Sequence, residues 1–324
     1  VGDNGGPLLM KTLGAKIDEK SIPVELNSRA LALIVDDSDD QQSVIGVQVR
    51  IDMQERYVKA RSGVILASGG FVMNDQMVKQ YAPELTRCTV PIGNPGDTGS
   101  GILMGMGVGG AAINMHEGFV SLPFYPPASL TYGIFINSQG QRFVNEDSYH
   151  GRVGAFILRE TGGPVYLVLA VEDYGKYETE SYLNADVAAT AESIVELESD
   201  LNLPPGELQA TMSDYNKHAK AGNDELFHKD PVWLKPLEPP FVALDVTPGR
   251  GAFYPYFTLG GLDTLPTGEV LKASGDVITG LYAVGRTACG IPMRGEGYAS
   301  GMSVGDATFT GRQAGMAAST RTTT

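Results

Sequence analysis

The spacing of hydrophobic residues predicts a chain in which helices and strands alternate. Leu9, Leu13 and Ile17 recur at four-residue intervals, which is typical of one helix face, and residues 22–26 are expected to follow as a strand. The run "GVILASGG" (63–70) is first apolar and then rich in small residues. We interpret it as a buried parallel strand that ends in a loop.

Two further features mark the first third of the chain. The acidic stretch "DDSDD" (36–40) joins two segments of strand-like alternation and predicts the turn of a hairpin. The segment 96–113 is rich in glycine yet has helical spacing. Because each glycine inside a helix costs about 1 kcal/mol, we expect this helix to pack closely against another backbone or a flat ligand.

The composition changes after about residue 122. A short strand, "YGIFINS" (132–138), precedes a turn, and two helices are expected between about 188 and 222. The first carries Ile194, Leu197 and Leu201 on its inner face. The second carries a stripe that we interpret as core, formed by Leu208, Met212, Tyr215 and Ala219.

The last part of the chain returns to α/β character. A buried strand, "GLYAVGR" (280–286), precedes the small-residue stretch "GEGYASGMSVGDATFTGRQAG" (295–315). The pattern predicts one discontinuous α/β domain with a middle insertion. We place its first part at residues 1–130, the insertion at 131–250 and the return segment at 251–324.

Composition and charge exclude several classes of function. The 324 residues are 42% hydrophobic and 19% charged, without an apolar run or a leader typical of a membrane span or of secretion. A net charge of −14 argues against nucleic-acid binding. Cys88 and Cys289 cannot form a disulfide framework, which favours a reducing, cytoplasmic setting. The four histidines show no ligand spacing, so no metal site is predicted.

The glycine-rich strand ends are the strongest chemical feature. In a doubly wound sheet, loops after the strands line the ligand-binding edge. A helix beginning near Gly301 would direct its N–H groups and the positive end of its dipole toward an electron-rich ring. The alternative is that its glycines only permit tight packing of the helix against the sheet. Hydrolase nucleophile elbows and phosphate-binding P-loops are absent from the sequence.

Five segments resemble, in the same order, the flavoprotein superfamily of fumarate reductases and 3-ketosteroid dehydrogenases: "GVILASGGF", "NPGDTGSGILMGMGVGG", "GIFINSQGQRFVNED", "TLGGLDT" and "GLYAVGR". Within it, "QRFVNEDSYHGRVG", "FTLGGL" and "GYASGMSVGDATFTGRQAG" most resemble the 3-ketosteroid Δ4-(5α)-dehydrogenases. The resemblance implies a Rossmann-like FAD-binding domain interrupted by an α+β catalytic cap domain. The family's GxGxxG fingerprint belongs to the first βαβ unit, and no GxGxxG precedes "GVILASGGF" here, so we expect that this first unit is missing.

The resemblance also implies a reaction and its residues. Two hydrogens would leave a ketone substrate, one as hydride to flavin N5 and one as an α-proton. Tyr298 is expected to accept that proton with Ser300 as its relay, and Tyr149 to support them as a hydrogen-bond donor. The alternatives are that the tyrosines only bury their rings and that Ser300 caps a helix.

The FAD contacts that the resemblance implies lie in four short segments. They are Ala67, Ser68, Gly69 and Gly70; Gly96 and Asp97; Gly285 and Arg286; and Ser303 and Val304. For Asp97, the alternative is that its side chain only caps the following helix.

A comparison with the dicarboxylate reductases of the superfamily bears on the substrate. Phe257 and His150 stand where those enzymes have a histidine and an arginine, and dicarboxylates need cationic clamps. We therefore expect an apolar ketone, a steroid, with an external electron acceptor. Arg152 is the nearby cation that could still bind a carboxylate substrate, and the alternative is that it pairs structurally with Glu146 or Asp147. The remaining alternatives are Δ1-dehydrogenation, an ene reductase, or a non-catalytic remnant.

Overall fold

One strand, β15 (Val277–Ala283), joins distant parts of the chain in a six-stranded sheet. The structure is a computed structural model that describes residues 5–38 and 42–321. β15 runs parallel to β4 (Val64–Leu66) and β2 (Ser43–Ile51), and antiparallel to β14 (Glu269–Leu271). Residues from both ends of the sequence therefore share one sheet, which confirms the discontinuous α/β architecture.

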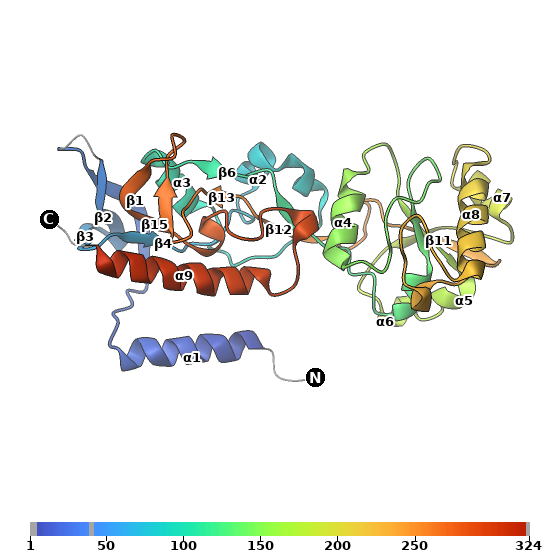
Figure 1. Ribbon diagram of the computed structural model, residues 1–324, viewed down its shortest axis with the longest axis horizontal. Helices are drawn as coiled ribbons and strands as arrows, with labels where there is room; N and C mark the ends of the chain where they lie inside the picture. Colours follow the sequence, from blue (N-terminus) through green and yellow to red (C-terminus); the bar gives the residue numbers. More distant parts are fainter. Residues whose placement is uncertain (1–4, 39–41, 322–324) are drawn as a thin grey trace.

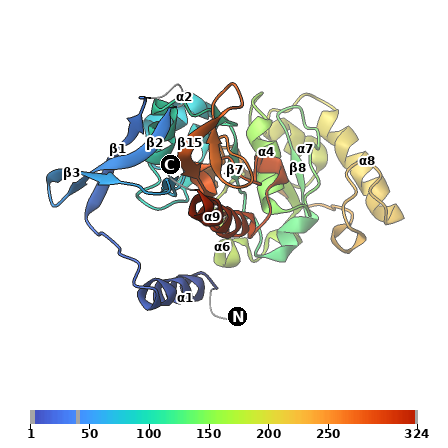
Figure 2. The same cartoon turned by 60° about the vertical axis from the view of Figure 1, so that its left-hand side comes forward.

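The antiparallel hairpin of β1 (Ser28–Asp36) and β2 extends this sheet, and β3 (Gln54–Lys59) pairs with β2. The hairpin confirms the predicted strand pair, although Asp39 and Asp40 of the acidic turn lie outside the described residues. Residues 22–26 do not form the expected strand, because they are exposed and pair with no described strand. The helix before them, α1 (Gly5–Glu19), buries none of its residues and stands apart from the rest in both views (Figures 1 and 2).

A second body holds a four-stranded antiparallel sheet in the order β10-β11-β9-β8 (Figure 1). Its strands are β8 (Ile134–Ile136), β9 (Tyr166–Ala170), β10 (Asp186–Ala191) and β11 (Phe241–Asp245). Its helices are α4 (His150–Arg159), α5 (Val171–Tyr174), α6 (Tyr177–Glu180), α7 (Ile194–Asp200) and α8 (Glu207–Ala221). All four residues of the predicted α8 stripe are buried, as expected. The exact domain boundaries stay predictions.

A small sheet connects the two bodies. β7 (Gly118–Val120), β12 (Pro255–Thr258) and β5 (Val90–Pro91) form it, with β12 central. β7 precedes the second body in sequence and β12 follows it, so the chain enters and leaves that body through neighbouring strands. A further pair, β6 (Ala112–Ile113) with β13 (Gly261–Leu262), lies on the first body's side in Figure 1.

The remaining helices belong to the first body: α2 (Asp75–Tyr81), α3 (Ser100–Gly107) and α9 (Met302–Thr320). α3 is the predicted glycine-rich helix. A methyl group at Gly101 would overlap the Ser68 side chain, and one at Gly105 would overlap Leu262, so these glycines permit close packing against side chains. No helix within residues 5–38 and 42–321 is both long and apolar enough to span a bilayer.

Gly260 gives a test of how closely the segment before β13 packs against residues 114–115. A Cβ atom there would lie 2.5 Å from the Asn114 carbonyl oxygen and 2.7 Å from the Met115 nitrogen. Because backbone atoms cannot rotate away, we expect Gly260→Ala to lower the free energy of unfolding by about 1–3 kcal/mol in urea denaturation. Gly175→Ala is the control, since its Cβ would make only an ordinary contact at 3.8 Å. Equal midpoints for the two variants would contradict this packing.

Candidate active site

The loop between β15 and α9 carries the first predicted catalytic residues. It passes through two short 3-10 turns, η4 (Gly285–Thr287) and η5 (Gly295–Gly297), before Tyr298. The Tyr298 hydroxyl donates a hydrogen bond to the Ser303 hydroxyl at 3.0 Å. The N-cap of α9 is Gly301, with φ of 91° and no side-chain capping bond. The alternative that Ser300 caps this helix is therefore wrong.

Tyr149 approaches the same place from the second body, at the N-cap of α4. Burial raises the pKa of its phenol, the neighbouring Tyr298 adds to this effect, and hydrogen bonding with Ser300 acts in the opposite direction. The structure thus brings Tyr149, Tyr298 and Ser300 together. The hydroxyl partner of Tyr298 differs from the expected one, because its phenol bonds to Ser303 rather than to Ser300.

Aromatic rings surround the two tyrosines. The Phe119 ring on β7 lies 4.5 Å from that of Tyr298 and 6.2 Å from that of Tyr149, measured between centroids. Phe119 also stacks on Phe257 at 4.8 Å. The sequence did not single out Phe119, because it belongs to a three-residue strand that is too short to show a period.

His150 and Arg152 follow Tyr149, in the region where a dicarboxylate substrate would need a cation. His150 Nδ1 lies 2.6 Å from the Ser121 hydroxyl, and burial lowers the pKa of this imidazole, which favours its neutral form. Arg152 is exposed and forms no ion pair among the described residues. The alternative that it pairs with Glu146 or Asp147 is wrong, since Glu146 is bound by other cations, and Arg152 is therefore an available cation three residues after Tyr149.

The predicted cofactor segment 67–70 lies at the end of β4. The Ser68 hydroxyl accepts a hydrogen bond from the Gly101 amide at 3.1 Å, at the start of α3. Gly69 has φ of 77°, and a side chain there would overlap the Asp97 carboxylate. Gly70 is buried beside Thr258, whereas Ala67 is exposed.

Asp97 and Arg286, both predicted cofactor residues, form an ion pair at 2.8 Å. The Asp97 carboxylate also accepts a hydrogen bond from the Asn94 amide at 3.0 Å. The N-cap of α3 is Gly99, so the alternative that Asp97 caps this helix is wrong. Gly285 is buried next to Arg286, and Gly96 is exposed next to Asp97. Segments 96–97 and 285–286 are therefore joined by this ion pair.

The first turn of α9, which includes Ser303 and Val304, is only partly covered by other described parts of the chain. Val304 is 57% exposed, and a Cβ added at Gly301 or Gly305 would meet no described atom within 4 Å. The first N–H groups of a helix have no partner inside it and attract electron-rich groups. Backbone donors of α9 are therefore accessible on the side of the helix that follows Tyr298.

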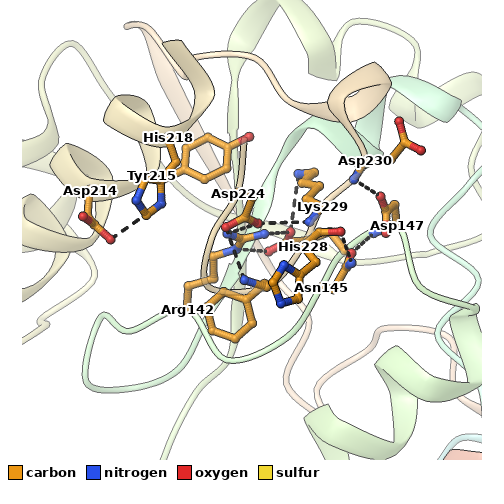
Figure 3. A network of polar contacts seen from close by, with 12 residues as sticks. Arg142, Asn145, Asp147, Asp214, Tyr215, His218, Asp224, His228, Lys229 and Asp230 are labelled. Carbon is orange, nitrogen blue, oxygen red and sulfur yellow. Dashed lines mark hydrogen bonds and ion pairs between the residues drawn. The ribbon is translucent and has the colours of Figure 1, made fainter. Parts of the chain in front are cut away.

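A buried network of charges supports the segment that leads to Tyr149 (Figure 3). Arg142 binds Glu146 through two hydrogen bonds of 2.6 and 2.8 Å, and binds Asp224 at 2.7 Å. Lys229 lies 3.4 Å from Glu146 and donates to the Gly133 carbonyl at 2.7 Å. The side chains of Glu146, Asp224 and Lys229 are all fully buried. Two cations and two carboxylates thus balance, and they join residues 142–146 to the loop after α8.

A family model described as FAD binding domain matches residues 1–304. The chain belongs to this FAD-binding family. The solved 3-ketosteroid-Δ4-(5α)-dehydrogenase from Rhodococcus jostii RHA1, in complex with 4-androstene-3,17-dione, is similar with a TM-score of 0.88 and 37% identity, covering 98% of this chain and 65% of that one. The FAD-binding fold expected from the sequence is thereby confirmed.

Curated relatives include both branches of the superfamily. The chain is 27% identical to a probable fumarate reductase of Shewanella frigidimarina, over 97% of this chain and 53% of that protein. It is 28% identical to a 3-oxosteroid 1-dehydrogenase of Mycolicibacterium smegmatis, over 90% of this chain and 58% of that protein. The chain spans about half the length of these curated relatives.

The exposed residues of the four predicted cofactor segments are chemically suited to bind the FAD of this family. Exposed backbone donors at Ser303 and Val304 suit the electron-rich pyrimidine of a flavin. Ala67 and Gly96 present exposed backbone at the neighbouring loop ends. The carboxylate of Asp97 and the guanidinium of Arg286 are engaged with each other, so these two side chains shape the edge of the site as a pair.

Glu146 gives a test of the buried network. Glu146→Ala would leave Lys229 buried without a carboxylate and deprive Arg142 of two hydrogen bonds. Removing one partner of a buried ion pair costs about 3–5 kcal/mol, and we expect a loss of this size in urea unfolding. The control is Glu180→Ala, which removes an exposed partner of Lys176 and should cost about 0–1 kcal/mol. A loss for Glu146→Ala no larger than for the control would show that the network does not stabilise the fold.

Proposed function

We propose that this protein is an FAD-dependent oxidoreductase that dehydrogenates a 3-ketosteroid between C4 and C5. One observation carries the proposal: Tyr149 from the second body and Tyr298 with Ser300 from the return loop converge on the same aromatic group. The similarity to a ketosteroid Δ4-dehydrogenase at 37% identity supports the choice of substrate. The wider oxidoreductase activity is also consistent with the FAD-binding family.

The aromatic lining suits an apolar ketone. Phe119 and Phe257 are stacked beside Tyr298, and such rings offer flat apolar surface rather than charge. Carboxylate substrates are best held by bidentate arginine. Arg286 is paired with Asp97, and His150 is favoured in its neutral form. The chemistry of these side chains thus favours a neutral substrate over a dicarboxylate.

The two tyrosines are assigned different roles. A carbonyl acidifies the hydrogen on its α-carbon, and Tyr298 accepts this proton while its own hydroxyl proton passes to a serine hydroxyl, which releases its proton to solvent. In the structure that hydroxyl belongs to Ser303, and Ser300 lies with Tyr149. Because the pKa of Tyr149 is raised, its phenol stays protonated at neutral pH and serves as a hydrogen-bond donor.

FAD, when bound, supplies the acceptor for the hydrogen that leaves the β-carbon as hydride. The residues proposed to hold it are those of the four loop ends: Ala67, Ser68, Gly69, Gly70, Gly96, Asp97, Gly285, Arg286, Ser303 and Val304. An external electron acceptor would complete the turnover. A cytoplasmic setting stays a prediction that rests on the two free cysteines.

Conservative variants of the hydroxyl groups test this assignment. We expect Tyr298→Phe to lower kcat by roughly 10²–10⁴-fold in the FAD-loaded protein, because general acid–base groups contribute about this much. Tyr149→Phe and Ser300→Ala should also lower kcat. The measurement is oxidation of 5α-androstane-3,17-dione with an artificial electron acceptor. Tyr182→Phe is the control, since Tyr182 is 70% exposed and should keep full activity.

The choice of substrate separates the alternatives. Oxidation of 4-androstene-3,17-dione, which already has the C4–C5 double bond, would assign Δ1-dehydrogenation, the activity named for the curated relative at 28% identity. Reaction with neither steroid would contradict a steroid substrate. Absence of flavin absorbance near about 450 nm in the purified protein would contradict flavin chemistry altogether.

A further inference from the structure

The loop that carries Tyr298 and Ser300 packs on β7 at Gly295 and at the Tyr298 ring, and its remaining residues border a groove. A hollow of about 310 Å³ lies beside it, lined by residues of both bodies, among them Leu85, Glu117, Leu158, Arg159 and Glu296. Residues 290–300 include no helix or strand except the short turn η5. The position of this segment therefore depends on individual contacts along it.

Few polar contacts hold the middle of this segment within the described residues. The Gly295 amide donates a hydrogen bond to the Glu117 carboxylate at 3.1 Å. Arg159, the last residue of α4, binds Glu296 at 2.6 Å. Arg159 reaches across from the second body, whereas Glu296 stands two residues before Tyr298. This ion pair is thus a direct tie between α4 and the loop.

The two ends of α4 contact the same loop. At its N-terminus, Tyr149 packs beside the Phe119 ring that also contacts Tyr298 of the loop, and at its C-terminus Arg159 binds Glu296. A helix of ten residues is about 15 Å long and stiff. A helix held at both ends sets the position of the loop relative to Tyr149, whereas one contact alone would leave a pivot.

We propose that the Arg159–Glu296 pair is a positioning pair, which holds Tyr298 and Ser300 in register with Tyr149. The role in catalysis rests on the function proposed above, whereas the tie between helix and loop does not. Both partners are partly exposed, with 59% and 33% of their side chains accessible. Such pairs contribute little to global stability. A displacement of about 1 Å in a catalytic group, however, can cost 100-fold in rate.

Cleavage by trypsin after Arg294 measures how firmly the Arg159–Glu296 ion pair holds the loop to α4, and it needs no steroid. Arg294 is exposed and directly precedes Gly295, whose amide is held by Glu117. Mass spectrometry of the fragment that begins at Gly295 reports how often the loop opens. We expect Arg159→Gln to raise this rate roughly 2- to 5-fold, the change expected for loss of one exposed ion pair. The thermal midpoint should stay unchanged.

A double-mutant cycle separates the ion pair from any direct effect that substitution of Glu296 has on trypsin cleavage after Arg294. Arg159→Gln is expected to speed cleavage when Glu296 is present, and to have no effect in a Glu296→Gln background. The control is Lys176→Gln, which breaks another exposed ion pair of the second body, with Glu180 at 3.6 Å, far from Arg294 in sequence. It should leave cleavage after Arg294 unchanged.

Steady-state kinetics then test the positioning role. In the FAD-loaded protein, Arg159→Gln should lower kcat by roughly fivefold or more with little change in KM, because the loop groups act in the transition state. Equal cleavage rates in Arg159→Gln and the unchanged protein would overturn the tie. Faster cleavage with an unchanged kcat would overturn the positioning role. If the unchanged protein oxidises no steroid, the proposed function fails, while the cleavage cycle still decides the tie.

Discussion

The close contact between α4 and β7 sets the distance between the two halves of the candidate site. A methyl group at Gly151 would overlap the Phe119 ring, and one at Gly154 would lie 2.6 Å from the Val120 carbonyl oxygen. Because both positions lack a side chain, the helix that begins after Tyr149 can lie directly on the strand that carries Phe119. Phe119 in turn touches Tyr298. Two glycines on one helix thereby allow residues from separate bodies to share one aromatic surface.

Sequence periodicity predicted the elements with long, one-sided burial and missed contacts between distant residues. The stripe on α8 was recognised because four apolar positions repeat at helical spacing and face one core. The charged network was not, since Arg142 and Asp224 come from segments about 80 residues apart that share no period. The hydroxyl partner of Tyr298 was mispredicted for a related reason. Spacing in the sequence places both serine hydroxyls near one helix start, but only the loop conformation decides which of them Tyr298 reaches.

The two glycine-rich helices show that composition alone does not predict what the glycines of a helix contact. In α3, the glycines at 101 and 105 are in tight contact with Ser68 and Leu262. In α9, added Cβ atoms at 305, 311 and 315 would meet no described atom within 4 Å. The two helices look alike as sequences, yet one uses its glycines for internal packing and the other presents them to open space. Tight packing of α9 against the sheet therefore does not explain its glycines among the described residues.

Most charges around the site are matched by a partner, and Arg152 near Tyr149 is an exception among the described residues. Arg142 and Lys229 are matched by Glu146 and Asp224 inside the second body, and Arg286 is matched by Asp97. The groups nearest Tyr149 and Tyr298 are aromatic rings and hydroxyls. Negative charge that develops on a ketone oxygen must then be stabilised by oriented hydroxyl and amide dipoles. Such dipoles act most strongly in an apolar surrounding, where a neutral substrate enters at little cost. A dicarboxylate would lose its hydration there and would depend on an exposed cation such as Arg152 to replace it.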